Sequence, residues 1–372
     1  MSEPLSKIPS GMRYYFGQEA CLRRSIEATA MSTFQGWSYE EISTPTVDYY
    51  SLFEHGMGAE AHRAFRFTDT DGRLLALRPD VTSATARAAA TLFAERERPL
   101  RFCYAAPVFR QKPQSHAEWK RESTQIGCEL IGTNSNVADL EVLAIVSEFL
   151  GRLDLESHYS ITLNDAGIFN GVAGALALDA AARDRMRQLI NVRNATDLEA
   201  FLAPYDSTDE ASVFAQIGRL SGKRETLSWA RQLIRNEQSR AALDRIETLW
   251  NVIESLGLKS AFEIDLGDVS RLDYYTGLTF KVYVEGAGAR VGSGGRYDGL
   301  TKSFGKMEPA VGFVMDLDAL TDVLRFRGGD LSNSGEPVAE GCELTTRDPA
   351  ALLRNAMDRR AEGKRVVLDL AR

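Results

Sequence analysis

A block of helical sequence interrupts the strand-forming part of this chain, and it limits the possible folds more than any other feature. Residues 100–109 and 123–132 read as strands before the block, and residues 261–266 and 278–284 do so after it. Residues 168–258 carry polar–apolar helical segments with few strand signals. We therefore expect an α+β fold in which groups of antiparallel strands are broken by helices, with a helical insertion at 168–258, rather than regular βαβ units.

Local signals place further elements around these strands. Apolar spacing predicts a helix over residues 18–35, and alternation after Gly36 predicts a strand that runs toward Pro45. An Asp-Gly pair at 71–72 predicts a hairpin within residues 65–78. Helices are expected from Asp80 or Thr82 to about residue 95 and over residues 137–153.

The organisation of the chain follows from changes in composition. Residues 1–325 form the expected core, and residues 326–341, rich in glycine, serine and asparagine, are expected to be a flexible linker. The tail, residues 342–372, reads as one helix from 349 to about 362 and one strand at 365–370. One helix and one strand cannot bury a core, so we expect this short αβ tail to pack on the main body or on a partner.

Charge and cysteine usage exclude several classes of protein. The 372 residues carry a formal net charge of −8, which disfavours a protein that binds tRNA or DNA through a broad basic face. The four cysteines and four histidines lack metal-ligand spacing, so neither a metal site nor a disulfide framework nor a cofactor is predicted. No apolar run approaches the roughly 18 residues that span a bilayer. We expect a cytoplasmic protein without membrane contact.

Three segments have the composition of binding sites. Residues 77–82 (Leu-Arg-Pro-Asp-Val-Thr) join a strand end to a helix start, where Asp80 and Thr82 either cap the helix or bind a ligand. Gln125 and Glu129 share one face of a strand, and a carboxylate on a mostly buried strand requires a partner, which is either an arginine or a ligand.

The third segment combines tyrosines with a glycine-rich stretch. Tyr274 and Tyr275 can line a small polar pocket, and residues 292–300 (Gly-Ser-Gly-Gly-Arg-Tyr-Asp-Gly-Leu) are either a plain hairpin turn or a place where backbone approaches a ligand. Arg296 would supply a counter-charge. Together the three segments suit a small amino acid better than a nucleoside triphosphate or a sugar.

These motifs resemble those of the class II histidyl-tRNA synthetases over residues 8–325. The runs Leu-Asp-Tyr-Tyr-Thr-Gly at 272–277 and Gly-Gly-Arg-Tyr-Asp-Gly-Leu at 294–300 are similar to the two histidine-recognition signatures of that family. Residues 77–82 resemble its Leu-Arg-Pro-Glu-Gly-Thr. Thr44-Pro45 stands where the first class II motif has its dimer-interface proline, which implies a dimer through the synthetase-like core. The resemblance also implies the class II fold, an antiparallel sheet flanked by helices.

The resemblance implies a histidine pocket and a nucleotide site. Around histidine it places Asp80, Thr82, Gln125, Glu129, Tyr274, Tyr275, Arg296 and Tyr297. Asp80 and Thr82 would hold the α-amino group with Gln125 nearby, and Glu129 and Tyr275 would face the imidazole. Arg110 matches the arginine that clamps the α-phosphate of ATP.

The sequence departs from the synthetases in the nucleotide site. Ser270 and Arg271 stand where that family has arginine followed by glycine, and a shift of one residue on a strand sends a side chain to the opposite face. Asp318-Ala319 replaces the Glu-Arg of the third class II motif, and Lys112 replaces a glutamate. Because nucleotidyl transfer relies on fixed positive charge, we expect adenylation to be lost and Arg110 to be vestigial.

The pattern is that of ATP phosphoribosyltransferase regulatory subunits, which resemble a synthetase core without the anticodon-binding domain; about forty residues after the linker are too few for that domain. The resemblance implies a non-catalytic subunit that works with a short catalytic subunit in the first step of histidine biosynthesis, is involved in feedback by histidine, and binds no tRNA. Two alternatives stay open: an enzyme that adenylates histidine, and a stand-alone histidine-binding module.

Overall fold

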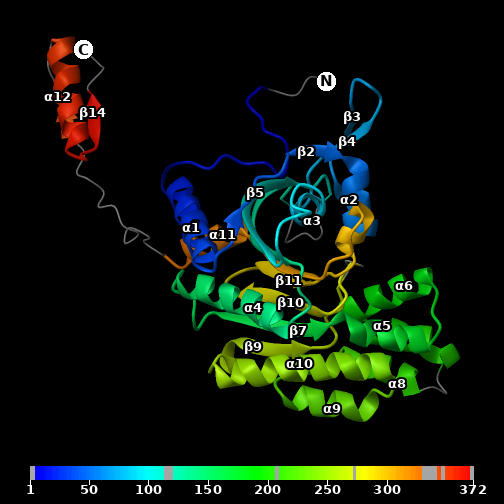
Figure 1. Cartoon of the computed structure of the whole chain (residues 1–372). Helices are drawn as coiled ribbons and strands as arrows, with labels where there is room; N and C mark the ends of the chain where they lie inside the picture. Colours follow the sequence, from blue (N-terminus) through cyan, green and yellow to red (C-terminus); the bar gives the residue numbers. More distant parts are fainter. Residues whose placement is uncertain are drawn as a thin grey trace. The chain divides into compact units, whose positions relative to one another are not determined.

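The computed structural model describes residues 5–112, 120–205, 209–270, 274–328, 342–344 and 348–368. The chain divides into two compact units, Met1–Leu324 and Arg325–Arg372, which Figure 1 shows coloured along the sequence. Arg271, residues 113–119 of the loop after Lys112 and most of the predicted linker lie outside the described residues.

The first unit is built on one nine-stranded sheet with the order β1-β5-β6-β12-β11-β10-β7-β9-β8. Its strands are β1 (Glu40–Glu41), β5 (Leu100–Phe109), β6 (Glu122–Ile131), β7 (Tyr159–Asp165), β8 (Ser221–Gly222), β9 (Phe262–Asp265), β10 (Leu278–Val284), β11 (Gly292–Arg296) and β12 (Ala310–Asp316). Neighbours are antiparallel except for the pairs β1–β5 and β7–β9. Strands from before and after the helical block thus form one continuous sheet.

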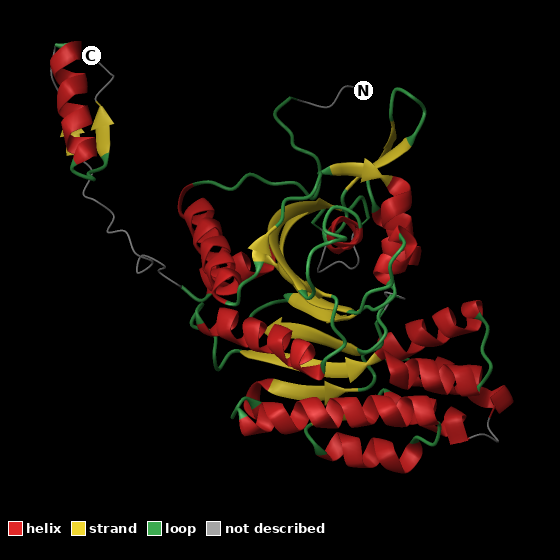
Figure 2. Ribbon diagram, in the orientation of Figure 1, coloured by secondary structure: helices red, strands yellow, loops and turns green. Residues whose placement is uncertain are grey.

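Helices cover both faces of this sheet. On one face lie α1 (Gly17–Gly36) and α4 (Asn136–Gly151), where the ring of Phe34 packs 6.1 Å from that of Phe149 and 5.7 Å from that of Phe313 between centroids. On the other face, α3 (Thr82–Ala90) sits within the curve of the strands, as Figure 2 shows. Its buried alanines have little side-chain volume, which lets this helix approach the sheet closely.

A small three-stranded sheet precedes α3. Its strands are β2 (Val47–Tyr49), β3 (Arg66–Thr68) and β4 (Leu74–Leu77), and α2 (Tyr50–Met57) and η1 (Gly58–Arg63) connect β2 to β3. The predicted hairpin is confirmed, with Gly72 at a positive φ of 83° in its turn. The predicted strand from residue 37 toward Pro45 is wrong for most of its length, since β1 has only two residues. Tyr39 instead folds back so that its N–H donates to Phe34 O.

The segment between β7 and β9 is almost entirely helical. It contains α5 (Ala166–Ala175), α6 (Ala180–Asn191), α7 (Ala195–Leu202), η2 (Ala203–Tyr205), α8 (Asp209–Ile217), α9 (Glu225–Leu233) and α10 (Glu237–Ser255). Side chains of Asp165, Asp179 and Asn236 cap helices in this segment by accepting backbone N–H bonds. Helix α10 packs against α5 and β7 and buries Trp250, which anchors the helical segment to the edge of the sheet.

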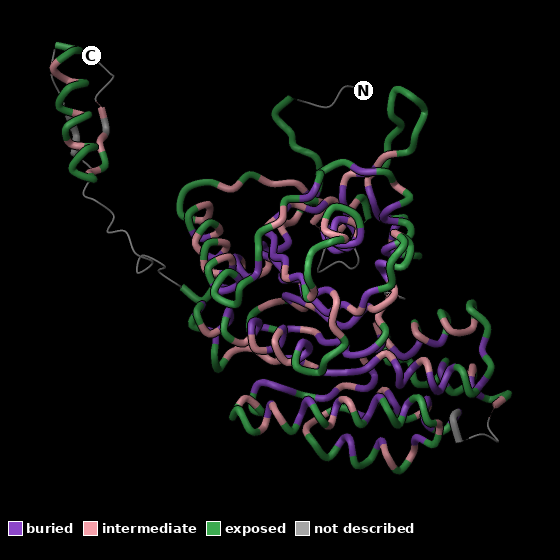
Figure 3. The backbone as a smooth tube through the Cα atoms, in the orientation of Figure 1, coloured by how far each residue is buried: buried purple, intermediate pink, exposed green. Residues whose placement is uncertain are grey.

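Three short elements complete the first unit: η3 (Lys259–Ala261), η4 (Leu300–Phe304) and α11 (Leu317–Phe326). The second unit contains β13 (Cys342–Leu344), α12 (Pro349–Ala361) and β14 (Val366–Leu368). The two strands pair in parallel across the helix, so the expectation of a single strand in the tail is wrong. None of the described residues of α12 is buried, as Figure 3 also shows.

Within the described residues, no helix combines the length and apolarity that crossing a membrane requires. The same residues contain no group of three or more His, Cys, Asp or Glu side chains arranged to hold a metal ion.

Candidate functional site

Glu129 lies at the centre of the site, on the face of the sheet that carries α3. Its side chain is 1% exposed and accepts three hydroxyl hydrogen bonds. Thr82 Oγ1 donates at 2.7 Å and Tyr104 Oη at 3.0 Å to one carboxylate oxygen, and Tyr297 Oη donates to the other. Burial raises the pKa of Glu129 to about 7, while these three hydroxyls oppose the rise. The partner that this carboxylate requires is a ring of hydroxyl groups, not an arginine.

Glycines keep the sheet surface beside Glu129 low. Residues paired across antiparallel strands share a face, so Glu129, Gly312 and Gly295 lie in one row. A Cβ atom at Gly312 would overlap Glu129 Oε2 and stand 2.5 Å from Cys128 O, and one at Gly295 would stand 2.8 Å from the Tyr275 ring. The glycine-rich segment is therefore a central strand over which side chains lie flat, and the hairpin-turn interpretation is wrong.

Three tyrosine rings surround this row. The ring centroids of Tyr274 and Tyr275 are 4.7 Å apart, and those of Tyr274 and Tyr297 are 5.8 Å apart. All three rings pack against the hydrophobic cluster that contains Phe102. Burial raises the pKa of Tyr275 to about 12, so its hydroxyl is protonated near neutral pH and can donate a hydrogen bond. The predicted tyrosines are thus brought together with Glu129.

Asp80 and Thr82 differ in the capping role that the sequence left open for both. Asp80 caps the start of α3 by accepting bonds from Ser83 N at 2.9 Å and Ser83 Oγ at 3.0 Å. Burial raises its pKa, against the effect of these bonds and of the Arg110 charge. Thr82 does not cap the helix, because its hydroxyl donates to Glu129.

Gln125 contributes an unsatisfied group. It is 8% exposed, and its Oε1 atom is buried without a hydrogen-bond partner in the described part of the chain. Buried carbonyl oxygens are usually hydrogen-bonded, so an orphaned one on the site face of β6 is a place where a ligand donor would fit.

Arg296 does not present a free charge to Glu129. Its side chain is buried and forms an ion pair with Asp139, with Nη2 at 2.7 Å and Nε at 3.0 Å from Oδ1. Further bonds run to the carbonyl oxygens of Thr133 at 3.1 Å and Ser135 at 3.2 Å. The positive charge expected from Arg296 is therefore neutralised by Asp139, and this ion pair links β11 to the start of α4.

The predicted nucleotide region lies at the ends of β5, β6 and β12. Arg110 Nε donates to Pro79 O at 3.1 Å. Burial lowers the pKa of the Arg110 guanidinium and the nearby charge of Arg63 adds to this, while Asp80 and Asp316 oppose it. Arg110 thus stands beside the site, among charges of both signs.

Asp318 is locked into the protein rather than open to a ligand. It is 1% exposed and accepts hydrogen bonds from Arg23 at 2.5 Å, from Thr124 N at 2.8 Å and from Tyr15 Oη. The guanidinium carbon of Arg23 lies 3.7 Å from the centroid of the Tyr15 ring. The N-terminal segment and α1 therefore hold the position next to Ala319.

Sequence reasoning missed Tyr104, Asp139 and the pair of Tyr15 with Arg23. Tyr104 was open to detection, because strand alternation from Leu100 puts Phe102 and Tyr104 on one face. The other partners lie far from their targets in sequence and carried no local signal.

Comparisons with known proteins agree with this geometry. The family model described as histidyl-tRNA synthetase matches residues 11–320. An ATP phosphoribosyltransferase regulatory subunit of Moorella thermoacetica is 36% identical over 366 residues, covering 98% of this chain and 92% of the relative. One from Geobacillus thermodenitrificans is 32% identical and covers 97% and 90%.

Solved structures give the same result. A Bacillus halodurans protein described as an ATP phosphoribosyltransferase regulatory subunit/histidyl-tRNA synthetase superposes with a TM-score of 0.87 at 30% identity, covering 100% of this chain and 95% of that one. Histidyl-tRNA synthetase from Nostoc sp. PCC 7120 reaches 0.79 at 19% identity, with 100% and 87% covered, which shows the shared fold alone. The predicted class II synthetase-like fold is confirmed, its sheet being mixed rather than purely antiparallel. The chain belongs to the histidyl-tRNA synthetase family and, within it, to the ATP phosphoribosyltransferase regulatory subunits.

Proposed function

We propose that this chain acts in the cytoplasm as the regulatory subunit of ATP phosphoribosyltransferase and binds histidine in the pocket around Glu129. It supports a short catalytic subunit in the first step of histidine biosynthesis and carries out no chemistry of its own. Two relatives that match nearly the whole chain are described as such regulatory subunits. The observation that carries the proposal is a site with groups for an amino acid around Glu129, while Ser270 and Ala319 stand where the synthetase pattern has two arginines.

Glu129 and Gln125 have the chemistry that histidine needs. An imidazole N–H is a good donor to a buried carboxylate, and Glu129 lies among hydroxyl groups that can turn to accept or donate. The orphaned Oε1 of Gln125 can accept a bond from an ammonium group, and the Asp80 carboxylate adds negative charge from the start of α3. In this proposal Tyr274, Tyr275 and Tyr297 form the walls, and Arg296 acts only by positioning β11.

The nucleotide region supports a non-catalytic role. Transfer of a nucleotidyl group needs cations at the departing pyrophosphate, and Ser270 and Ala319 supply none. Each lost cation costs roughly 10² to 10³ in rate, by analogy with one oxyanion donor. Arg110 remains, but one guanidinium does not replace three.

The small sheet supports a homodimer through the core. Val47, Tyr49 and Phe67 share one face of this sheet by their register, and each is between 41% and 44% exposed. Exposed apolar side chains gathered on one face mark an interaction surface. We propose that this face and the neighbouring Thr44-Pro45 segment form the dimer contact. Phe67→Asp should yield monomers in sedimentation analysis, and an unchanged dimer would place the contact elsewhere.

The decisive experiment is a phosphoribosyltransferase assay of a short catalytic subunit, with and without this chain, titrated with histidine. We expect activity to need this chain and to fall as histidine is added, with weaker inhibition for a Glu129→Gln complex. Equal activity without the chain would refute the regulatory role. Unaltered inhibition of the Glu129→Gln complex would move the histidine site elsewhere. Brisk pyrophosphate exchange by the purified chain with histidine and ATP would favour the adenylating alternative.

A further inference from the structure

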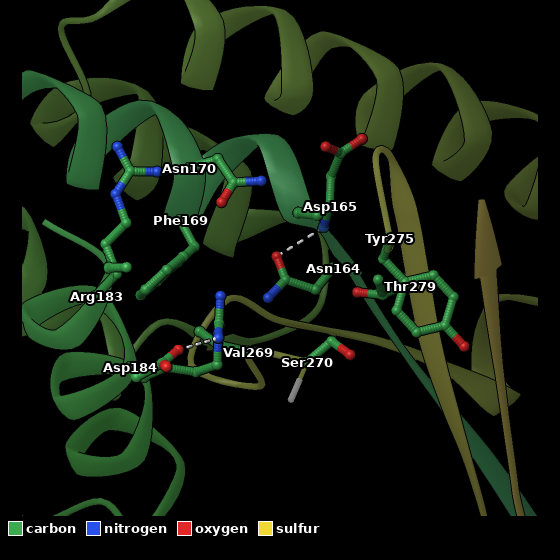
Figure 4. Close-up of a pocket in the computed structure, with 13 residues that line it drawn as sticks. Asn164, Asp165, Phe169, Asn170, Arg183, Asp184, Val269, Ser270, Tyr275 and Thr279 are labelled. Atoms are coloured by element: carbon green, nitrogen blue, oxygen red, sulfur yellow. Dashed lines mark hydrogen bonds and ion pairs between the residues drawn. The ribbon is translucent and has the colours of Figure 1, made fainter. Parts of the chain in front are cut away.

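A second polar cavity of about 290 Å³ lies where the helical segment meets the sheet. Its floor comes from Asn164 on β7 and Thr279 on β10, and its sides come from α5, α6, Val269, Ser270 and Tyr275. Figure 4 shows Phe169 and Asn170 entering from α5, Arg183 and Asp184 from α6, and the Tyr275 ring closing the side nearest β10. The row that contains Glu129, Gly312 and Gly295 continues through Thr279 to Asn164, so both pockets lie on one face of the sheet.

The acidic groups of this cavity are already neutralised. Asp165 forms a two-pronged ion pair with Arg245 at 2.9 Å and 2.8 Å, and also caps α5 by accepting a bond from Gly167 N at 2.8 Å. Asp184 pairs with Arg187 at 2.8 Å. The carboxylates that line the cavity therefore leave little negative charge to attract a cation.

Three other groups stay available. Arg183 donates from Nε to Leu178 O at 3.0 Å, and within the described residues it forms no ion pair. The side chains of Asn170 and Thr279 make no hydrogen bond with any residue that the structure describes. Asn164 is not available, because its amide donates to Leu266 O and Asp268 O and accepts from Asp165 N. One guanidinium, one amide and one hydroxyl without ion pairs thus line this cavity, Arg183 and Asn170 on its helical side and Thr279 on the sheet.

From these groups we infer that the cavity binds a small hydroxylated oxyanion, whose phosphate or carboxylate pairs with Arg183 and whose hydroxyl groups bond to Asn170 and Thr279. A guanidinium matches both kinds of oxyanion with two parallel N–H bonds. The amide and the hydroxyl can each donate and accept, as sugar-like hydroxyl groups require. This site is separate from the proposed histidine pocket and shares only the Tyr275 ring with it.

Saturation-transfer NMR at constant ionic strength tests this inference on the full chain with three probes: ribose 5-phosphate, gluconate and uncharged ribose. We expect one or both anions to bind and ribose to bind far more weakly; the preferred anion identifies the phosphate or the carboxylate. Arg183→Gln should weaken anion binding by at least about tenfold, since it removes a charge-assisted bond. Arg185→Gln, on the exposed side of the same helix, is the matched control and should bind like the unchanged chain.

Asn170→Ala provides a second variant, which leaves the bond from Arg183 to Leu178 in place, and thermal unfolding verifies that each variant is folded. Absence of binding by both anions would overturn the inference. So would equal binding of ribose, or folded Arg183→Gln and Asn170→Ala variants that keep full affinity.

Discussion

Two regions of the first unit use their polar side chains differently: the region around Glu129, on the face of the sheet that carries α3, and the region around Asp318, at the start of α11. Around Glu129, the side chains form a hydroxyl network over bare glycine backbone, with one carbonyl oxygen of Gln125 left open. Around Asp318, the side chains close on one another, and Arg23 and Tyr15 take up the carboxylate. The first unit thus combines an open carbonyl oxygen on the same strand face as Glu129 with a fully paired carboxylate in α11, directly after β12.

Under the proposed function, this difference explains how a scaffold can lose a reaction and keep its fold. The glycine floor and the buried carboxylate depend on the backbone register of β6, β12 and β11, which folding itself maintains. The cations of a nucleotide site are single side chains, and their removal leaves the register unchanged. In the proposed function, a binding site therefore outlasts a reaction on the same sheet.

The largest effect is expected from Gly312→Ala, which changes the region around Glu129. The added methyl group would overlap the Glu129 carboxylate and approach Cys128 O, so we expect a loss of about 3 kcal/mol in unfolding free energy. Histidine binding should disappear with it. Urea unfolding and calorimetry measure the two effects. Gly174→Ala is the control: this helical position has open space, and alanine there should stabilise by up to about 1 kcal/mol.

Asp318→Ala tests the hydrogen-bonded region around Asp318. It leaves the Arg23 guanidinium and the Thr124 N–H without their acceptor, and we expect a loss of roughly 1 to 3 kcal/mol in unfolding free energy. Histidine affinity should change little. On the same helix, Asp322→Ala removes partly exposed ion pairs and should cost less than about 1 kcal/mol. Equal losses of unfolding free energy for the two variants would mean that the buried bonds of Asp318 stabilise the protein no more than the partly exposed ion pairs of Asp322.

The pH dependence of stability tests the region around Glu129. Because the folded pKa of Glu129 is about 7 and its ordinary value is 4.5, the folded state holds this proton more tightly than the unfolded state. Its contribution is therefore complete below about pH 4.5 and is lost as pH rises through about 7, on the order of 2 to 3 kcal/mol. Urea midpoints compared between the unchanged chain and Glu129→Gln should converge or cross over this range. Parallel curves would contradict the buried titration.

The smallest effect is expected from Arg110→Ala in the assembled phosphoribosyltransferase. If the predicted nucleotide region has no catalytic role, activity should stay within about twofold of that of the unchanged complex, as for a substitution far from any catalytic group. Steady-state rates with both nucleotide substrates measure this, and circular dichroism confirms folding. A collapse of activity in a folded complex would show that the vestigial arginine still works.

Local sequence signals predicted the elements that depend on local chemistry. Alternation fixed residues 100–109 as a strand, and apolar spacing located the helix that the structure has at Gly17–Gly36. The region toward Pro45 failed, because Tyr39 is held by the end of α1 instead of extending in a strand. The second strand of the tail was missed, since three residues carry no clear period.

The site shows the same limit. The residue types around Glu129 were evident from their strand positions and from the family signatures. The pairing of Arg296 with Asp139, and of Asp318 with Arg23, joins residues separated by 157 and 295 positions. Such pairs depend on tertiary packing, which a single sequence does not display. A side chain that a motif suggests for a ligand can therefore already be committed to the scaffold.

The hydroxyl ring around Glu129 has a consequence for how tightly any guest can be held. A carboxylate has about four acceptor positions, and this one already accepts three internal bonds, so a guest finds one position open and displaces a hydroxyl group for each further bond. Exchange of this kind favours modest, readily reversed affinity. Reversible binding of this kind lets the occupancy of a site follow the concentration of a metabolite. A catalytic site, in contrast, must bind its substrate and convert it.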